Sequence, residues 1–388
     1  MMYSGYSLWT VVGAAAGLIS VTKGDEAWQE IYGFRTGKQK GTQSFQKDKL
    51  WYAPGVDGIP SMLIASDEDH GRQRRIVSHA FSERSLHNQE WLIQKYANLL
   101  VSRIKETDIA EGKVSDLNEW YTWTTFDVIA DLTFGRSLGC LESKSTHRFV
   151  KAMIDGIKSF PIFYCIHHWP TLQRIYRLVV GEAGSIKQRN DWIASLKGMV
   201  AKRIDAETDR HDFMTDILNK VQDEESKGKE GMTRGEITSN ANLMMGAGTE
   251  TTATVLQGVT FLVLQNPKVY ETLCKEVRGR FKSLDDITID AANSLTYTIA
   301  VLTEAMRLFP AVPAGFLRKV PLEGTEISGC FIPGNCNASI SMSQHASYTD
   351  SSNFRDADKF VPERWLGDER YKDDNRATFS PFSFGPRK

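Results

Sequence analysis

A carboxylate and a hydroxyl stand side by side in a long apolar stretch of this chain. Glu250 and Thr251 lie in the segment GAGTETT (246–252), and Glu250 is the only charged residue between Ile237 and Gln265. Such a pair can pass protons to or from a reacting atom. Two glycines inside a helix cost on the order of 1 kcal/mol each relative to alanine. Their presence therefore indicates that a flat, bulky group approaches the backbone here.

The stretch around this pair is predicted to be one long helix. Thr233 and Glu236 have the spacing of a capping box, and Asn266-Pro267 suits the start of a following helix. The helix between them has about thirty residues, or roughly 45 Å. A membrane-spanning helix over 243–264 is an alternative, although its carboxylate and threonines count against it. A plain core helix is the other alternative, and it leaves the glycine–threonine cluster unexplained.

Two further charges occur in the apolar helix predicted within 295–310. Glu304 and Arg307 are three residues apart and therefore share a face. On a surface, such a pair contributes only a few tenths of a kcal/mol. A helix that is apolar all round is usually buried, and a buried ion pair needs a further partner for its remaining hydrogen bonds. Arg364, in the segment FVPERW (360–365), is the candidate for that partner.

A basic helix is predicted to begin at Ser66. Ser66 and Asp69 have the spacing of a helix cap, and His70 and Arg74 then lie on one face. Basic helix faces are most often simply solvated. The alternative is a clamp for carboxylates or phosphates, in which the arginine fork makes bidentate contacts.

Composition excludes some classes of protein. The 388 residues carry a net charge of −1, which gives no reason to expect a nucleic-acid partner. The five cysteines are scattered without metal-like spacing and fit a reducing compartment. The fold class is predicted to be mainly α with a small β region after Pro310, including strands within 315–320 and 329–334. Residues 1–20 form an apolar segment, interpreted as a weak membrane anchor, a cleaved signal, a buried helix or a start-site artefact.

Together these motifs resemble the cytochrome P-450 family of haem-thiolate monooxygenases. The segment AGTETT (247–252) resembles the oxygen-activation segment of the family's central helix. Glu304, Arg307 and Arg364 resemble its ion-pair triad. The last residues, FSFGPRK (382–388), resemble the start of the haem-binding motif F-x-x-G-x-R-x-C-x-G. The likeness extends from about Ser20 to the end, and it is nearest to fungal secondary-metabolism members of the trichothecene-hydroxylase kind.

The resemblance implies a cytochrome P-450 fold, incomplete at both ends, with a single domain over 21–388. It implies haem b as cofactor, and the residues expected to contact it are His70, Arg74, Ala247, Gly248, Arg318, Phe382, Gly385 and Arg387. None of the cysteines present stands in the haem motif. The axial ligand is therefore expected to be a cysteine immediately after Lys388, and no metal ligand is expected within the chain.

The implied reaction is the hydroxylation or epoxidation of a hydrophobic polyketide or terpenoid with O2. Glu250 and Thr251 are the expected catalytic residues, and they would deliver protons. Electrons would come from NADPH through a cytochrome P-450 reductase. The family implies membrane association at the cytosolic face of the endoplasmic reticulum. Two alternatives remain: an inactive, truncated remnant without the axial cysteine, and a haem-free binding protein.

Overall fold

The computed structural model describes residues 24–36, 44–49, 51–52, 54–167, 169–180, 182–206, 212–218, 231–334 and 338–388. The predicted apolar segment 1–20 lies outside these residues. The chain divides into two compact units, and the boundary falls inside a helix. Unit 1 comprises 1–48, 258–286 and 293–388, and unit 2 comprises 49–257 and 287–292. Whether 21–388 is a single domain stays a prediction.

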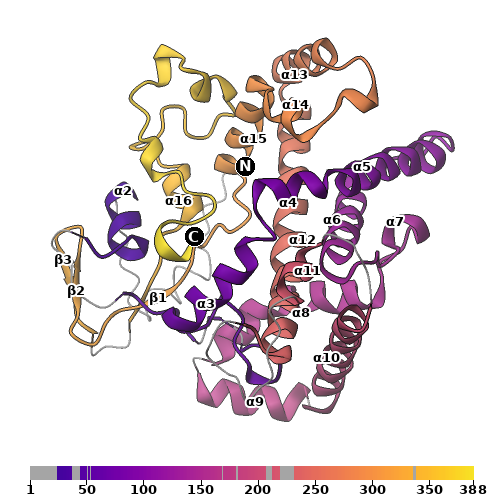
Figure 1. Ribbon diagram of the computed structural model, residues 1–388. Helices are drawn as coiled ribbons and strands as arrows, with labels where there is room; N and C mark the ends of the chain where they lie inside the picture. The colour runs from indigo at the N-terminus through magenta and orange to yellow at the C-terminus, as the bar shows by residue number, and fades with distance from the viewer. Residues whose placement is uncertain are drawn as a thin grey trace. The chain divides into compact units, whose positions relative to one another are not determined.

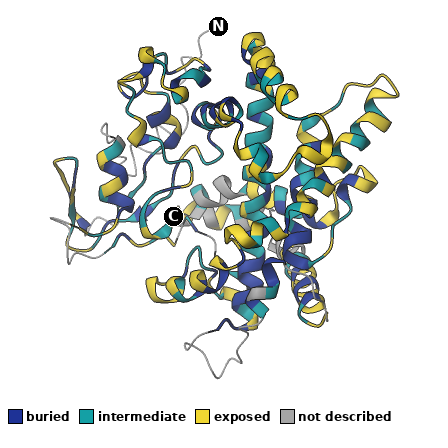
Figure 2. Ribbon diagram, turned by 45° about the horizontal axis from the view of Figure 1, so that its top comes forward, coloured by how far each residue is buried: buried dark blue, intermediate teal, exposed yellow. Residues whose placement is uncertain are grey.

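Unit 2 is helical, and its helices run in colour from indigo through magenta to orange in Figure 1. Its core contains large apolar side chains such as Phe126, Leu141 and Met245, each fully buried. Buried and exposed residues occupy different sides of its helices in Figure 2, as amphipathic sequences require. Its helices are α3 (Asp67–Ser78), α4 (Glu83–Asn88), α5 (Glu90–Ile104), α6 (Leu117–Phe134), α7 (Cys140–Ser143), α8 (Arg148–His167), α9 (Pro170–Val180), α10 (Glu182–Ile204), α11 (Phe213–Leu218), the first part of α12 (Arg234–Gln265) and most of α14 (Ile289–Asn293).

The long helix α12 begins as the sequence predicts. The backbone N–H of Thr233 donates to a Glu236 carboxylate oxygen at 2.9 Å, and the Glu236 N–H donates to the Thr233 hydroxyl at 3.2 Å. This reciprocal pair is the capping box. The helix ends at Gln265, and α13 (Pro267–Arg280) begins with its proline at the first position. In the part of the chain that the structure describes, no helix has both the length and the apolar character needed to cross a membrane.

The cap should contribute measurably to stability. Replacing Thr233 with alanine is expected to lower the free energy of unfolding by about 1 kcal/mol, because the Glu236 N–H loses its acceptor. Urea denaturation measures the change. Thr272→Ala, at an exposed position within α13, is the matched control and should have little effect. Equal losses in both variants would contradict the capping role.

Unit 1 contains the small β region. Strand β1 (Arg318–Lys319) pairs antiparallel with β4 (Ser339–Ile340), and β2 (Thr325–Ile327) pairs antiparallel with β3 (Cys330–Ile332). The two strands predicted within 315–320 and 329–334 are confirmed, although each is shorter than its segment. The helices of this unit are α2 (Gly24–Ala27), the last turns of α12, α13, α15 (Thr296–Leu308) and α16 (Gln344–Tyr348).

A π-helical turn (Trp28–Tyr32) follows α2 and makes hydrogen bonds to the β region and to the C-terminal loop of this unit. The Tyr32 hydroxyl donates to the Phe316 carbonyl at 2.7 Å and accepts the Met342 N–H at 3.0 Å. The Trp28 indole donates to the Thr378 carbonyl at 2.7 Å. The turn therefore fixes the β region and the C-terminal loop in one core.

Candidate functional site

The predicted ion-pair triad forms in unit 1. Glu304, Arg307 and Arg364 are all completely buried. The Arg307 guanidinium donates to both Glu304 carboxylate oxygens at 2.9 Å, and Arg364 Nε donates to Glu304 Oε1 at 3.0 Å. Tyr297, Ala300, Val301 and Ala305 of α15 are buried beside the pair, which is therefore enclosed in the core, as the sequence indicated. The third partner is the predicted one.

The triad has two further members that the sequence did not indicate. Asp374 pairs with Arg364 Nη1 and is almost completely buried. The Trp365 indole donates to Glu304 Oε2 at 2.9 Å. Two arginines and two carboxylates therefore make a network without net charge, which is what a low-dielectric interior requires. Nothing local in the sequence distinguishes Asp374 from the neighbouring acidic residues of its loop.

Both guanidinium groups also bind the backbone of the surrounding loops. Arg307 donates to the carbonyls of Tyr348, Ala357 and Lys359 at 2.6, 2.7 and 3.0 Å. A second set of carbonyls accepts from Arg364, whose Nη2 reaches Arg355 at 3.0 Å and Asp356 at 3.3 Å. These contacts satisfy the donors that ion pairing leaves over.

A second cluster in unit 1 consists of three cations. Arg318, the predicted cofactor contact on β1, is buried, and Lys47 pairs with it across an antiparallel bridge. Burial and the positive charges of Arg318 and Arg387 lower the pKa of Lys47 to about 6. The predicted residues Arg318 and Arg387 therefore lie close together, and Lys47 is a member that the sequence analysis missed.

The loop FSFGPRK packs against the Trp28–Tyr32 turn. Gly385 has a φ of +76°, and a Cβ there would lie 1.9 Å from the Tyr32 carbonyl oxygen. Only glycine fits this position without movement of the backbone. Phe382 is 70% exposed. The loop thus holds Arg387 beside the other two cations, while Phe382 stays at the surface of unit 1.

The basic cluster fits the acidic groups of a haem. Three cations that lie close together and partly out of water favour an anionic ligand, and guanidinium forks match carboxylates in geometry. The two propionates of a haem supply such carboxylates. The roles of Phe382, Gly385, Arg318 and Arg387 toward the haem stay predictions, as does the position of the axial ligand.

In unit 2, α3 begins at its predicted cap. The Ser66 hydroxyl accepts the Asp69 N–H at 3.1 Å. His70 is half-buried and Arg74 is exposed. Between them in sequence, Arg72 binds Glu236 of α12 at 2.5 Å, so it belongs to the interior contacts of unit 2. The assignment of His70 and Arg74 to a haem clamp stays a prediction.

The Glu250–Thr251 pair is half-buried on α12. The Thr251 hydroxyl donates to the Ala247 carbonyl, four residues earlier, at 2.6 Å. Such a bond can open a helix locally, but α12 is helical from Arg234 to Gln265. The helix therefore continues without interruption past Glu250 and Thr251.

The structure gives Gly248 a different explanation from the expected one. A Cβ at Gly248 would lie 2.8 Å from the Ile129 side chain of α6. A side chain at position 248 would have to displace the tip of Ile129, so α12 and α6 pack closely at this point. At Gly246 a Cβ would meet nothing within 4 Å. The proposed cofactor contacts of Ala247 and Gly248 stay predictions.

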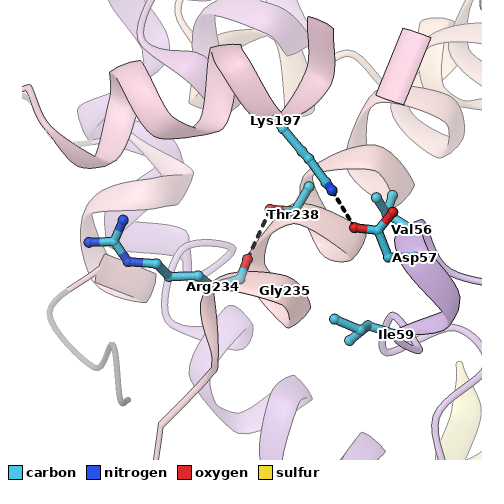
Figure 3. A pocket seen from close by; sticks show the side chains of 7 residues that line it. All are labelled: Val56, Asp57, Ile59, Lys197, Arg234, Gly235 and Thr238. Carbon is cyan, nitrogen blue, oxygen red and sulfur yellow. Dashed lines mark hydrogen bonds and ion pairs between the residues drawn. The ribbon is translucent and has the colours of Figure 1, made fainter. Parts of the chain in front are cut away.

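A pocket of about 220 Å³ lies near the start of α12 (Figure 3). Lys197 of α10 pairs with Asp57 across it, whereas the guanidinium of Arg234 points away from this pair. Lining residues are Val56, Asp57, Ile59, Lys197, Arg234, Gly235 and Thr238. Thr238 precedes Thr251 by roughly 20 Å along the helix axis, at 1.5 Å per residue. The pocket is therefore separate from the Glu250–Thr251 pair.

The family model for cytochrome P-450 matches residues 34–388. The chain belongs to the cytochrome P-450 family. It is therefore a haem-dependent monooxygenase that uses O2, receives electrons from a reductase and acts on a small molecule. Its fold is accordingly the mainly α, small-β fold that the sequence predicted.

Curated cytochrome P-450 relatives cover nearly the whole chain. Cytochrome P-450 monooxygenase traB of Penicillium crustosum is 46% identical over 95% of this chain and 72% of its own length. Cytochrome P-450 monooxygenase lcsI of Purpureocillium lilacinum is 38% identical over 93% of this chain and 68% of its own length. An averantin hydroxylase of Dothistroma septosporum is 38% identical over 88% and 63%. All three come from fungi, and they favour the monooxygenase over a haem-free binding protein.

Proposed function

We propose that this cytochrome P-450 uses haem b to hydroxylate or epoxidise a hydrophobic polyketide or terpenoid in a fungal biosynthetic pathway. Its relatives support a biosynthetic role, since one of them is named for the hydroxylation of averantin. The reductase would be NADPH-dependent, at the cytosolic face of the endoplasmic reticulum membrane. The observation that carries the proposal is the Glu250–Thr251 pair on an unbroken α12, in a chain matched by the family model.

The residues of this chain would divide the work in two. Lys47, Arg318, Arg387, His70 and Arg74 would neutralise the acidic groups of the haem. The haem, once bound, supplies the chemistry of O2 reduction and oxygen transfer. The protein would hold the cofactor through these charged side chains and would exclude water around it.

Thr251 would receive and pass on a proton at its hydroxyl oxygen. Because the hydroxyl proton is engaged with the Ala247 carbonyl, the Thr251 oxygen presents its lone pairs outward as an acceptor. A donor is then needed, and the Glu250 carboxyl group is the adjacent candidate. The pair therefore provides a relay in which one group accepts while its neighbour exchanges protons with water.

Thr251→Ala should uncouple NADPH consumption from product formation. Product formed per NADPH is expected to fall by about tenfold or more, since positioned proton transfer contributes roughly 10²–10⁴-fold. The measurement compares the amount of NADPH oxidised with the amount of oxygenated compound formed. It uses the haem-loaded protein expressed from the full gene. Thr252→Ala, at the exposed neighbouring position, is the control and should stay coupled. Unchanged coupling in Thr251→Ala would remove the proposed role.

The reaction class has its own test. The full gene is expressed with a fungal reductase, and candidate polyketides and terpenoids are supplied under air and under nitrogen. We expect a thiolate-type Soret band in the reduced, CO-bound spectrum and an oxygenated product only under air. A protein that takes up haem but oxygenates neither class would overturn the proposed substrate class. A protein that takes up no haem would overturn the assignment of the cofactor.

A further inference from the structure

A chain of buried hydrogen bonds joins α3 to the first turns of α12 within unit 2. Gln73 of α3 and Asn240 of α12 are each 1% exposed. The Asn240 amide donates to Gln73 Oε1 at 2.9 Å, and Gln73 Nε2 donates to Glu236 Oε1 at 3.2 Å. Arg72 adds contacts to Glu236 from the same helix, at 2.5 and 3.2 Å. Two helices are thus joined by side chains that have almost no access to water.

The direction of these hydrogen bonds is set at both ends. Asn240 Oδ1 accepts the backbone N–H of Met62 at 2.9 Å, so the other side of its amide must donate. That amide group donates to Gln73 and to the Glu236 carbonyl. Gln73 must then turn its own amide group toward the Glu236 carboxylate, which is acceptor-only when ionised. Neither amide can flip without placing two donors or two acceptors face to face.

Glu236 caps α12 and also accepts hydrogen bonds from α3. Its burial raises the pKa of its carboxyl group, but hydrogen bonds from Arg72 and Thr233 outweigh this effect, and the pKa is lowered overall. The carboxylate therefore stays ionised and accepts from both helices at neutral pH. One residue thus caps α12 and holds α3.

The segment before α3 is seated on the same face of α12. The Ser239 hydroxyl accepts the Val56 N–H at 3.0 Å and donates to the Ile59 carbonyl at 2.7 Å. These two residues are the ends of a tight turn whose middle residues, Asp57 and Gly58, have φ values of +54° and +77°. This is the geometry of a type I′ turn. Ser239 and Asn240 together hold 56–62 against α12, and the turn forms one wall of the pocket in Figure 3.

The rotation of α3 decides where its exposed edge lies. With about 100° per residue, Gln73 lies roughly 60° from His70 on one side of the helix, and Arg74 lies about 40° from His70 on the other side. Fixing Gln73 on α12 therefore fixes the direction of His70 and Arg74. On α12 itself, Glu250 follows Asn240 by roughly 15 Å along a continuous helix.

We propose that Gln73 and Asn240 are positioning residues for the haem: they fix the rotation of α3 on α12, and so set where His70 and Arg74 meet the cofactor relative to Glu250 and Thr251. This proposal rests on the proposed function. The two amides touch neither the haem nor the substrate and act only through α3. Their loss should loosen the hold on the haem more than the loss of an equally buried group elsewhere in unit 2.

The test is the rate of haem loss from the haem-loaded product of the full gene, followed as transfer to excess apomyoglobin. Asn240→Leu removes all three hydrogen bonds of the amide with little change in volume. We expect haem loss to accelerate by about tenfold, the equivalent of the net contribution of one hydrogen bond. Gln73→Met is the milder variant, and it decides the question if Asn240→Leu does not fold.

Asp127→Asn is the control for stability. Asp127 is fully buried in unit 2 and accepts the N–H groups of Leu138, Cys140 and Leu141 at 3.1, 3.2 and 2.9 Å. Its loss should lower the thermal midpoint comparably while haem loss stays within about twofold of the parent, because α3 is not involved. Equal acceleration in the control and in the α3–α12 variants would overturn the proposal.

The Gln73→Met/Asn240→Leu double variant supplies a second criterion. Because both residues act through one hydrogen-bonded chain, the effects on haem loss should be clearly less than additive. Fully additive effects would contradict the inference that Gln73 and Asn240 act through one hydrogen-bonded chain. A parent protein that binds no haem would instead contradict the proposed function, so the two failures are distinguishable.

Discussion

Replacing Glu304 with glutamine is expected to lower the free energy of unfolding by about 3–5 kcal/mol, the cost of breaking a buried ion pair on one side. Glu304 receives five hydrogen bonds, from Arg307, Arg364, Trp365 and the Val361 backbone. Glutamine can accept at one oxygen only, and its amide group would face guanidinium donors. Asp374, which pairs with Arg364, would then be the single carboxylate left to balance the charges of the two arginines. Urea denaturation of the haem-free chain measures the loss.

The matched control is Glu369→Gln, the same substitution in an exposed ion pair of unit 1. Glu369 lies 3.5 Å from Lys372, and both side chains are mostly in water. Solvent screening leaves such a pair with little effect on stability, so a much smaller change is expected. Comparable losses in the two variants would show that burial does not determine the energetics of the triad.

Replacing Lys47 with methionine should stabilise the haem-free chain and flatten its response to pH. The pKa of Lys47 is about 6 in the fold, against an ordinary value of 10.5. Between these values the unfolded chain binds the proton and the folded chain does not, so this group makes stability rise with pH from about 6 to 10.5. Below about pH 6 both states are protonated and the unfavourable contribution is fully present. Urea midpoints at pH 6.5 and pH 9 should therefore differ less in Lys47→Met than in the parent.

Lys372→Met controls for the loss of one positive charge. Lys372 belongs to unit 1 but is 65% exposed, so its removal should leave the difference between the two pH values unchanged. A parent chain whose midpoint does not rise over this pH range would contradict a half-buried Lys47 held beside two arginines. If Lys47→Met instead lowers the midpoint at pH 6.5, the ammonium group has a compensating anion within the chain.

The elements of this fold that sequence could predict are those with local rules. The capping box at Thr233 and Glu236 and the cap at Ser66 depend on spacings of three residues, and both form as predicted. The Glu304–Arg307 pair was recognisable because its helix offers no polar face. Each of these predictions needs only the helix period and the chemistry of neighbouring side chains.

The parts that sequence could not predict depend on the path of loops through space. Asp374 reaches Arg364 through the turns of a loop, and Lys47 reaches Arg318 through a bridge between segments far apart in the chain. Glu236 was recognised as a cap, whereas its ion pair with Arg72 needed the packing of two helices. Gly248 is predicted to contact a cofactor, and the structure shows in addition that the Ile129 side chain lies close to it. A glycine shows only that something comes close, and the sequence does not say what.

The loops from Thr349 to Asn375 carry a consequence of the buried arginines. This part of unit 1 has only short 3₁₀ turns and no strand, yet it contains buried residues such as Phe354, Ala357 and Phe360, and unpaired carbonyls beside them would be costly. Arg307 and Arg364 together donate hydrogen bonds to five main-chain carbonyls, as the N–H groups of a neighbouring strand would do in a sheet. Hydrogen bonds from two side chains thus take the place of strand pairing. Proteases should consequently cut this region when either arginine is replaced, and the lack of regular secondary structure alone should not make it susceptible.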